Sequence, residues 1–410
     1  MHRTHKIALD PTNVQATGLA RAAGCARFAY NWALARWSEQ YEAHRADPSL
    51  PRPSQMSLRR ELNAIKRQEF PWMLESTKCA PQEAIIALGV AFKNFFAGRT
   101  KHPTFKKRGQ HDAFRLSSGQ FRIEDKRLRV PNVGWIRMRE DLRWKDARAI
   151  SVTISKRAGR WFASIQCEFE ELAASRSTAS GLQGTIGVDV GVREYVLSDG
   201  TRHQVPRHLR TKLRSLRRAQ QSLSRKTKGS ANRAKARARV ARLHAGVVDA
   251  RSDWLHKITT NLAVTHDKIV IEDLNVRGMA SNHHLALSII DASFGEFRRQ
   301  LEYKTKDHGA ELVLADRWFP SSKICSTCGA RTKRIMSLSV RTWTCESCGA
   351  QHDRDLNAAR NLAAYDPAGS SSVAACGALL AAADDESEGS SSTSRRDESG
   401  TEHRNELQLV

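Results

Sequence analysis

The spacing of hydrophobic and polar residues changes twice along the chain, so three kinds of structure are expected. After a short strand-like segment at residues 6–9, apolar residues recur with helical spacing through the first hundred residues. The proline-rich segment 47–53 interrupts that spacing, which predicts one helix before it and two after it. Residues 11–104 are therefore expected to form a helical subdomain.

A period of two replaces the helical spacing in the next part of the chain. Apolar and polar residues alternate at 150–154, residues 158–159 can form a turn, and the alternation resumes at 161–169. This pattern predicts a β-hairpin within a small barrel or sheet, which the strand at 6–9 completes. The all-β subdomain is assigned to residues 1–10 and 105–180.

Residues 184–192 and 195–200 are predicted to form two tightly joined apolar strands, and continuous apolar runs follow at 268–274 and 311–314, with helical stretches between and after them. Runs of this kind suit central strands that are buried on both faces, and their alternation with helices is typical of an α/β fold. The chain is therefore expected to combine an α/β part with all-β and helical subdomains.

A strongly basic segment lies between the two joined strands and the run at 268–274. Residues 207–242 contain fourteen lysines and arginines and no acid, while apolar residues keep a narrow helical stripe. The pattern predicts an antiparallel helical hairpin that turns near residues 228–230. Charge runs are usually solvated surface, but so many cations without an acid repel one another, and a bound polyanion relieves that repulsion. The cations expected to contact nucleic acid are Arg207, Arg210, Lys212, Arg214, Arg217, Arg218, Arg225, Lys226 and Lys228.

The overall charge agrees with a polyanionic partner. The 410 residues carry a formal net charge of +24, although residues 366–410 hold nine acids against three arginines. That acidic tail, rich in Ser and Gly, is expected to be disordered. The longest nearly apolar run, 373–383, falls short of the roughly 20 residues of a spanning helix, and no signal-type apolar core follows the basic N-terminus. We therefore expect no membrane partner.

Four cysteines have the spacing of a metal site. Cys325 and Cys328 form one CxxC pair, Cys345 and Cys348 form a second, and a glycine follows each pair. Two such turns can aim four sulfurs at one point, which predicts a tetrahedral zinc site at 321–349. Chance pairs or redox disulfides are the alternatives. Four protein ligands leave no position for a reacting water, so this zinc is expected to be structural.

Candidate catalytic groups are acids at the ends of apolar strands. Asp189 lies in Ile-Gly-Val-Asp-Val-Gly, Glu272 lies in Ile-Val-Ile-Glu-Asp-Leu, and Asp353 or Asp355 could add a third. Each acid alone could be a solvated strand end, and Asp353 could merely cap a helix. Three converging carboxylates can hold two magnesium ions about 3.5 to 4 Å apart and support phosphodiester hydrolysis in an RNase H-like sheet.

Several of these segments together resemble one family. Segments 187–191, 271–274 and 352–361 and the four-cysteine element resemble the split RuvC motifs and inserted zinc ribbon of TnpB proteins, which insertion sequences encode and which are ancestral to type V CRISPR effectors. Further similar segments are Asn31–Leu34, Phe92–Phe96 and Phe294–Lys304, so the resemblance spans residues 1 to about 365.

The resemblance implies a magnesium-dependent, RNA-guided DNA endonuclease from a prokaryote, located in the cytoplasm and associated with the nucleoid. Its implied partners are a guide RNA from the transposon end and a double-stranded DNA target beside a short adjacent motif. The implied domains are a wedge-like β-barrel (1–10 and 105–180), a helical recognition lobe (11–104), a RuvC nuclease (181–320 and 350–365) with the basic hairpin at 205–260, the zinc ribbon (321–349) and the tail (366–410).

The resemblance also implies roles for individual residues. Asp189, Glu272 and Asp355 become the catalytic, magnesium-binding carboxylates, and Asp353 becomes a neighbour. Lys78 and Gln82, one helical turn apart, match the residues with which the family reads the adjacent motif. The alternative is that they are ordinary solvated residues at the start of a helix. The basic hairpin suits RNA, the guide–target heteroduplex or both. Two other functions stay open: a catalytically idle DNA-binding protein that regulates the transposon, and a transposase that joins strands itself.

Overall fold

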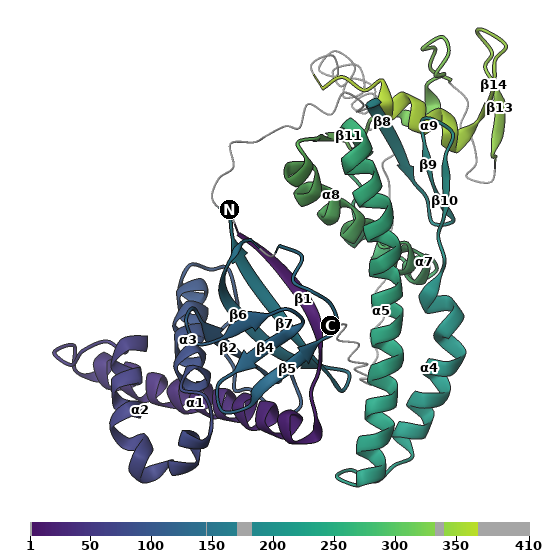
Figure 1. Cartoon of the computed structure of the whole chain (residues 1–410). Helices are drawn as coiled ribbons and strands as arrows, with labels where there is room; N and C mark the ends of the chain where they lie inside the picture. Colours follow the sequence, from purple (N-terminus) through teal and green to yellow (C-terminus); the bar gives the residue numbers. More distant parts are fainter. Residues whose placement is uncertain (1, 145, 170–182, 333–339, 368–410) are drawn as a thin grey trace, which may run out of the picture. The chain divides into compact units, whose positions relative to one another are not determined.

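A computed structural model describes residues 2–144, 146–169, 183–332 and 340–367 (Figure 1). The chain divides into two compact units. Unit 1 comprises Met1–Leu182, Val205–Thr265 and Val276–Ala310, and unit 2 comprises Gln183–Gln204, His266–Asn275 and Glu311–Val410. Almost all of the predicted acidic tail lies outside the described residues.

Unit 1 contains an antiparallel sheet in the order β2-β6-β7-β1-β5-β4-β3. The predicted hairpin is confirmed, because β6 and β7 pair along their lengths around a turn at Ala158 and Gly159, both at positive φ. The strand predicted at residues 6–9 is also confirmed, since it lies within β1 and pairs with β7. The strands are β1 (His2–Asp10), β2 (Ala113–Ser117), β3 (Arg122–Glu124), β4 (Arg127–Val130), β5 (Gly134–Met138), β6 (Arg148–Arg157) and β7 (Arg160–Glu168).

This sheet is open in the described part of the chain, not the closed barrel that the resemblance implied. β2 and β3 are its edge strands, and closure would require them to pair. Instead, α1 (Asn13–Ala46) and α3 (Cys79–Phe96) pack against β2 and cover that edge. These two helices therefore cover the β2 edge, which a closed barrel would have paired with another strand.

The three predicted N-terminal helices are confirmed as α1, α2 (Gln55–Glu69) and α3, with a short 3₁₀ helix, η1 (Pro71–Glu75), before α3. α1 begins at a capping box in which Gln15 N donates to Thr12 Oγ1 and Thr12 N donates to Gln15 Oε1. Small buried alanines line the inner face of α1, so α3 can pack closely against it. The rings of Trp37 and Phe92 stack across this contact at 4.3 Å.

The predicted basic hairpin is confirmed as α4 (His208–Ser224) and α5 (Ala231–Thr265), which pack together and turn at residues 225–230. α6 (Val276–Ser281), α7 (Ala286–Ala292) and α8 (Phe294–His308) follow in the same unit. Buried Lys304 of α8 donates from Nζ to His256 O, Thr259 Oγ1 and Thr260 Oγ1 of α5. Burial, assisted by the nearby Arg143 charge, lowers the pKa of Lys304 to about 8.

Unit 2 is built on a mixed sheet in the order β10-β9-β8-β11-β12. β8, β11 and β12 run parallel, whereas β8, β9 and β10 form an antiparallel meander. The apolar runs predicted as buried strands are therefore confirmed as neighbours in one sheet. The strands are β8 (Gln183–Val190), β9 (Glu194–Leu197), β10 (Arg202–Gln204), β11 (His266–Glu272) and β12 (Glu311–Ala315).

Helix α9 (Arg354–Ala363) packs directly on β8, and Gly187 is what permits the close approach. A Cβ at Gly187 would overlap the Ala359 carbonyl oxygen and the Ala363 nitrogen of α9. Backbone atoms cannot move aside as a flexible side chain can, so only glycine fits there. The glycine in the Gly-Val-Asp-Val-Gly segment therefore sets the distance between the central strand and the last described helix.

The cysteine-rich part of unit 2 contains little regular structure. Its elements are η2 (Ser321–Lys323), β13 (Thr342–Thr344) and β14 (Gln351–Asp353), and β13 pairs with β14. β14 ends where α9 begins, so the cysteine-rich part is continuous with that helix. Among the helices of the described residues, none combines the length and the apolar character needed to cross a membrane.

Candidate functional site

The three candidate carboxylates lie on three elements of unit 2. Asp189 is near the end of β8, Glu272 is the last residue of β11, and Asp355 is in the first turn of α9. β8 and β11 are parallel neighbours in a register that pairs Val188 with Ile271, so Asp189 and Glu272 follow at the same edge of the sheet. The carboxyl ends of parallel strands are the usual place for functional side chains in α/β sheets.

Asp189 is the most perturbed of the three. Burial raises its pKa well above the ordinary value, and the charges of Glu272 and Asp355 raise it further. The charges of Arg354 and Arg341 act in the opposite direction. The three acids are therefore close enough to interact electrostatically, and Asp189 lies at the centre of that interaction.

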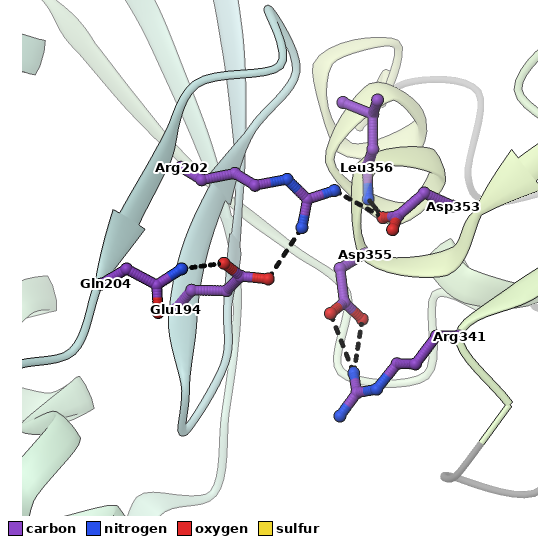
Figure 2. A network of polar contacts seen from close by, with 7 residues as sticks. All are labelled: Glu194, Arg202, Gln204, Arg341, Asp353, Asp355 and Leu356. Carbon is purple, nitrogen blue, oxygen red and sulfur yellow. Dashed lines mark hydrogen bonds and ion pairs between the residues drawn. The ribbon is translucent and has the colours of Figure 1, made fainter.

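Asp355 is held by an arginine that sequence reasoning missed. Nη1 of Arg341 lies 3.2 Å from Oδ1 and 2.9 Å from Oδ2 of Asp355 (Figure 2). A backbone hydrogen bond also holds the Arg341 segment against the start of α9, because Arg354 N donates to Arg341 O at 2.7 Å. Arg341 precedes β13, so the cysteine-rich part delivers a cation to the acid cluster.

The carboxylates do not form a tight ligand set in this arrangement. Within the described residues, the one group of His, Cys, Asp or Glu residues whose ligand atoms all lie within 4.8 Å of one another is the four cysteines. Asp355 is engaged by Arg341 instead. The donor set nevertheless fits a hard divalent cation, since carboxylate oxygens are the ligands that magnesium prefers and a cation would compensate the buried Asp189.

A second arginine fixes the start of α9. Arg202 of β10 lies between two acids: its Nη1 is 2.7 Å from Glu194 Oε1, and its Nη2 is 3.0 Å from Asp353 Oδ1 (Figure 2). The same Oδ1 of Asp353 accepts the backbone N–H of Leu356 at 2.9 Å, and Gln204 donates to the other oxygen of Glu194. Asp353 is thus the N-cap of α9, which was one of the readings that the sequence left open.

Glu272 and its neighbour Asp273 contact the segment after β12. Ser321 Oγ donates to Glu272 Oε1 at 2.6 Å, and Arg317 Nη2 lies 2.6 Å from Asp273 Oδ2. Ser321 is itself buried. The sequence held no signal for either contact, because the two partners of each contact are more than forty residues apart.

The four predicted zinc ligands do come together. Sγ of Cys325 lies 3.7 Å from Sγ of Cys348, and Sγ of Cys328 lies 3.7 Å from Sγ of Cys345. A tetrahedron with zinc–sulfur bonds of about 2.3 Å has sulfur–sulfur edges of about 3.8 Å. The cluster therefore has the size that zinc requires, and all four cysteines are free of disulfides.

Side chains from β14 and α9 surround this cluster. Nε2 of buried His352 lies 3.0 Å from Sγ of Cys325. Asn357 donates to Ile324 O and accepts from Ser326 N, and Asn361 donates to the carbonyls of Ser321 and Ile324. The asparagines spaced one turn apart on α9 thus bind the first CxxC loop to the helix that carries Asp355. Their spacing was a signal that sequence reasoning did not use.

Lys78 and Gln82 lie at the start of α3, with Lys78 as the N-cap residue in a helical conformation. Lys78 is exposed and Gln82 is partly buried. Lys78 lines a cavity of about 350 Å³ together with Thr77, Gln120 and Asn132, but Gln82 is not among the lining residues. The two predicted readers are thus on one helix, and only Lys78 borders the cavity.

The predicted nucleic-acid contacts on the basic hairpin are all exposed: Arg207, Arg210, Lys212, Arg214, Arg217, Arg218, Arg225, Lys226 and Lys228. A buried acid of α7 anchors the hairpin beneath them. Asp291 accepts the backbone N–H groups of Leu209 and Arg210, at 2.9 and 3.1 Å, and lies 3.3 Å from Arg251 Nη2. The hairpin is therefore a fixed basic surface of unit 1.

Three family models match the chain. The model described as "Probable transposase" matches residues 164–283, the model described as "Cas12f1-like, TNB domain" matches residues 294–362, and a "Helix-turn-helix domain" model matches residues 1–46. The second match contains the four cysteines, Arg341 and Asp355. The first contains Asp189, Glu272 and the basic hairpin.

Two curated relatives match over most of their length, and a third matches over a shorter segment. A protein of Streptomyces pristinaespiralis named "Putative RNA-guided DNA endonuclease" is 41% identical over 387 residues, covering 92% of this chain and 91% of the relative. A protein of Escherichia coli strain K12 named "Putative RNA-guided DNA endonuclease InsQ" is 35% identical, covering 91% and 94%. The "TnpB-like protein L79" of Acanthamoeba polyphaga mimivirus is 32% identical over 126 residues, covering 29% and 23%.

Among solved structures, a chain of the "Cryo-EM structure of the Cas12f1-sgRNA-target DNA complex" aligns with a TM-score of 0.49 at 14% identity. It covers 85% of this chain and 82% of that chain.

Proposed function

This chain belongs to the TnpB family, and from that premise we propose that it is a transposon-associated, RNA-guided DNA endonuclease that cleaves a target beside a short adjacent motif by metal-dependent phosphodiester hydrolysis. The main support for this chemistry is that Asp189, Glu272 and Asp355 converge from three elements. Burial and the charges of the other two acids raise the pKa of Asp189. A desolvated acid such as Asp189, repelled by two neighbouring carboxylates, is costly unless a cation is held among the three.

In this proposal, Asp189, Glu272 and Asp355 hold catalytic magnesium, which when bound activates a water and stabilises the charge that develops on the phosphate. The chain's own residues orient these ligands. Ser321 fixes the Glu272 carboxylate by its hydrogen bond, and the Asp353 cap fixes the first turn of α9. Arg341 neutralises Asp355 until a divalent ion shares that carboxylate.

Cys325, Cys328, Cys345 and Cys348 hold a structural zinc in this proposal. The four thiolates complete a tetrahedron and leave no open position, so the metal supplies stability and not a nucleophile. The sulfur–sulfur distances support this, as do the asparagine contacts that connect the first CxxC loop to α9.

The proposed partners are a guide RNA from the transposon end and double-stranded DNA. The exposed cations of the basic hairpin support phosphate binding, and pairing with the guide supplies sequence specificity. Lys78 and Gln82 read the adjacent motif from the start of α3, where the cavity beside Lys78 offers room for a base edge. We place the protein in the cytoplasm, acting on the nucleoid.

The functional parts that we propose keep the boundaries drawn from the sequence, with the sheet open. Residues 11–104 are the recognition subdomain, residues 1–10 and 105–180 the wedge, residues 181–320 and 350–365 the RuvC-type nuclease with its basic hairpin, and residues 321–349 the zinc ribbon. The register of β8 with β11 and the packing of α9 on β8 support the nuclease assignment.

The test is purification of the full chain from cells that also transcribe its native flanking DNA. Bound RNA is sequenced, and a plasmid library that matches its guide segment is incubated with the complex and magnesium, with Asp189→Ala as control. We expect discrete RNA and cuts that the substitution abolishes, and the cut plasmids reveal the adjacent motif. Bound RNA without any cut would favour the binding-only protein, and strand-joined products formed without RNA would favour a transposase.

A further inference from the structure

Trp318 presents the largest apolar side chain of unit 2 to solvent. Its exposed fraction is 84%, more than that of any other large apolar residue in the described part of the chain. Tryptophan is enriched at binding interfaces because its ring offers a large rigid apolar face, so an exposed indole that is held in a fixed position favours a binding role.

The segment that carries Trp318 is fixed on both sides. Trp318 N donates to Asp316 Oδ1 at 2.8 Å, and Phe319 N donates to Asp316 O at 3.0 Å, which closes a turn. Asp316 N donates to the hydroxyl of Tyr365, and the rings of Phe319 and Tyr365 pack edge to face at 4.9 Å. The turn is thus anchored to Tyr365, just beyond α9, while the Trp318 indole stays exposed.

The same segment borders the proposed nuclease centre. Arg317, directly before Trp318, pairs with Asp273, and Ser321, three residues after it, donates to Glu272. Glu272 and Asp273 are consecutive, so the turn around Trp318 spans the two contacts beside a candidate metal ligand. Arg317 remains about half exposed and can still reach a phosphate.

We propose that Trp318 is a stacking platform for one unpaired base of the DNA strand that enters the nuclease centre. This inference rests on the proposed function, since the occupant is the strand being cut. Every base offers a π-face to an indole, so the contact is tolerant of sequence, and Arg317 adds charge complementary to the adjoining phosphate. A base that is stacked within a duplex offers no free face, so the occupant is a single strand.

The first experiment separates stacking from apolar contact. Trp318→Tyr keeps an aromatic face, whereas Trp318→Leu keeps apolar bulk without one. In cleavage by the RNA-loaded full chain, we expect Trp318→Ala and Trp318→Leu to raise KM for target DNA roughly 5- to 150-fold, the range for loss of one base–aromatic stack, and Trp318→Tyr to stay near wild type. Equal effects of Trp318→Leu and Trp318→Tyr would overturn the proposal.

The second experiment locates the base and does not need cleavage. Single-stranded DNA is prepared with a segment complementary to the copurified guide and an unpaired extension at each end. One abasic site is placed at successive positions of the extensions, and the affinity for the Asp189→Ala complex is measured. We expect one position at which the abasic site weakens binding to the Trp318 protein but not to its Trp318→Ala derivative. Weakening that is the same in both at every position would refute the platform.

The two proposals fail differently. If the RNA-loaded wild type cuts nothing, the nuclease assignment fails, and the abasic scan still decides whether Trp318 stacks on a base. If Trp318→Ala instead changes the sedimentation behaviour of the chain and leaves DNA affinity unchanged, the indole contacts a second copy and the proposal is wrong.

Discussion

Asp353 provides a test of how α9, the helix that carries the candidate ligand Asp355, is positioned, because the Asp353 carboxylate makes two separable interactions. It caps α9 by accepting Leu356 N–H, and it pairs with Arg202, which also holds Glu194 (Figure 2). Asparagine caps a helix nearly as well as aspartate but carries no charge. Asp353→Asn therefore removes the ion pair and keeps the cap, whereas Asp353→Ala removes both.

The magnitudes follow from the exposure of the pair. The Arg202 and Asp353 side chains are 34% and 36% exposed, so solvent screens their attraction, and the pair contributes at most about 1 kcal/mol. Loss of an N-cap costs about 1 kcal/mol more. We expect Asp353→Asn to weaken the start of α9 by about 1 kcal/mol, or roughly 5-fold, and Asp353→Ala by about 2 kcal/mol, or roughly 30-fold.

Amide hydrogen exchange in the first turn of α9 measures this local opening directly. The protection of these amides should fall in the order wild type, Asp353→Asn, Asp353→Ala. The Arg202→Ala effect should be largely absent in the Asp353→Asn background, because the two residues share one interaction. Although burial opposes it, the Leu356 N–H and Arg202 lower the pKa of Asp353, so the protection persists in mild acid and is lost as pH falls through that lowered pKa.

Cleavage supplies the functional half of the same prediction. Because Asp355 is two residues beyond the cap, Asp353→Ala should lower kcat by about an order of magnitude or more, since small displacements of a reacting group are costly. Arg193→Ala, which removes an exposed arginine, is the matched control for the cleavage assay. If Asp353→Asn exchanged as fast as Asp353→Ala, or if Arg202→Ala and Asp353→Asn effects simply added, the division into cap and ion pair would be refuted.

The remaining predictions concern other parts of the chain. Gly187→Ala should reduce cleavage at least 100-fold, because its Cβ overlaps the backbone of α9; a fully active variant would mean that α9 does not lie on β8. Cys345→Ser should release zinc, detected with a chromogenic chelator, and expose the first CxxC loop to protease, whereas retention of stoichiometric metal would contradict the four-sulfur site. Asp291→Ala should lower the free energy of unfolding of unit 1 by about 3 kcal/mol in urea denaturation, because Asp291 is 3% exposed and its loss leaves Arg251 buried and unpaired; a change below 1 kcal/mol would be inconsistent with that anchor. Lys304 has a pKa of about 8 in the folded chain and 10.5 when free, so burying its charged form destabilises the fold fully below pH 8 and progressively less above it. The free energy of unfolding of the wild type should therefore rise between pH 8 and 10.5 relative to Lys304→Met, and parallel pH profiles of the two proteins would exclude the effect.

Local patterns predicted most elements because their causes are local. The alternation at 150–154 and 161–169 specified a hairpin whose turn needs positive φ at Ala158 and Gly159, and the structure has both. The apolar stripe through the basic segment predicted a helical hairpin, and the structure has its two helices as α4 and α5. The CxxC spacing specified the cluster of four sulfurs because each pair is a single turn.

The contacts that hold the candidate centre together could not be read in the same way. Arg202 lies on an edge strand and Arg341 before a short one, and neither position has a periodicity or motif that pairs it with an acid of α9. The alternation left a small barrel and an open sheet as alternatives, and the resemblance favoured the barrel, because sequence alternation does not encode whether helices cover a sheet edge. These ion pairs and the open sheet edge depend on which segments, distant in sequence, become neighbours when the chain folds.

The packing of α9 on Gly187 has a consequence for the timing of synthesis. Asp189 emerges from the ribosome in the middle of translation, but its partner Asp355 belongs to the last described helix, which ends at Ala363. Contacts between such distant segments form late, after the local hairpins and helices. The basic hairpin is therefore complete while the proposed nuclease centre still lacks one acid. A chain truncated before α9 would present the basic surface without the complete set of proposed metal ligands, so the capacity to cut would arise only after α9 has been synthesised.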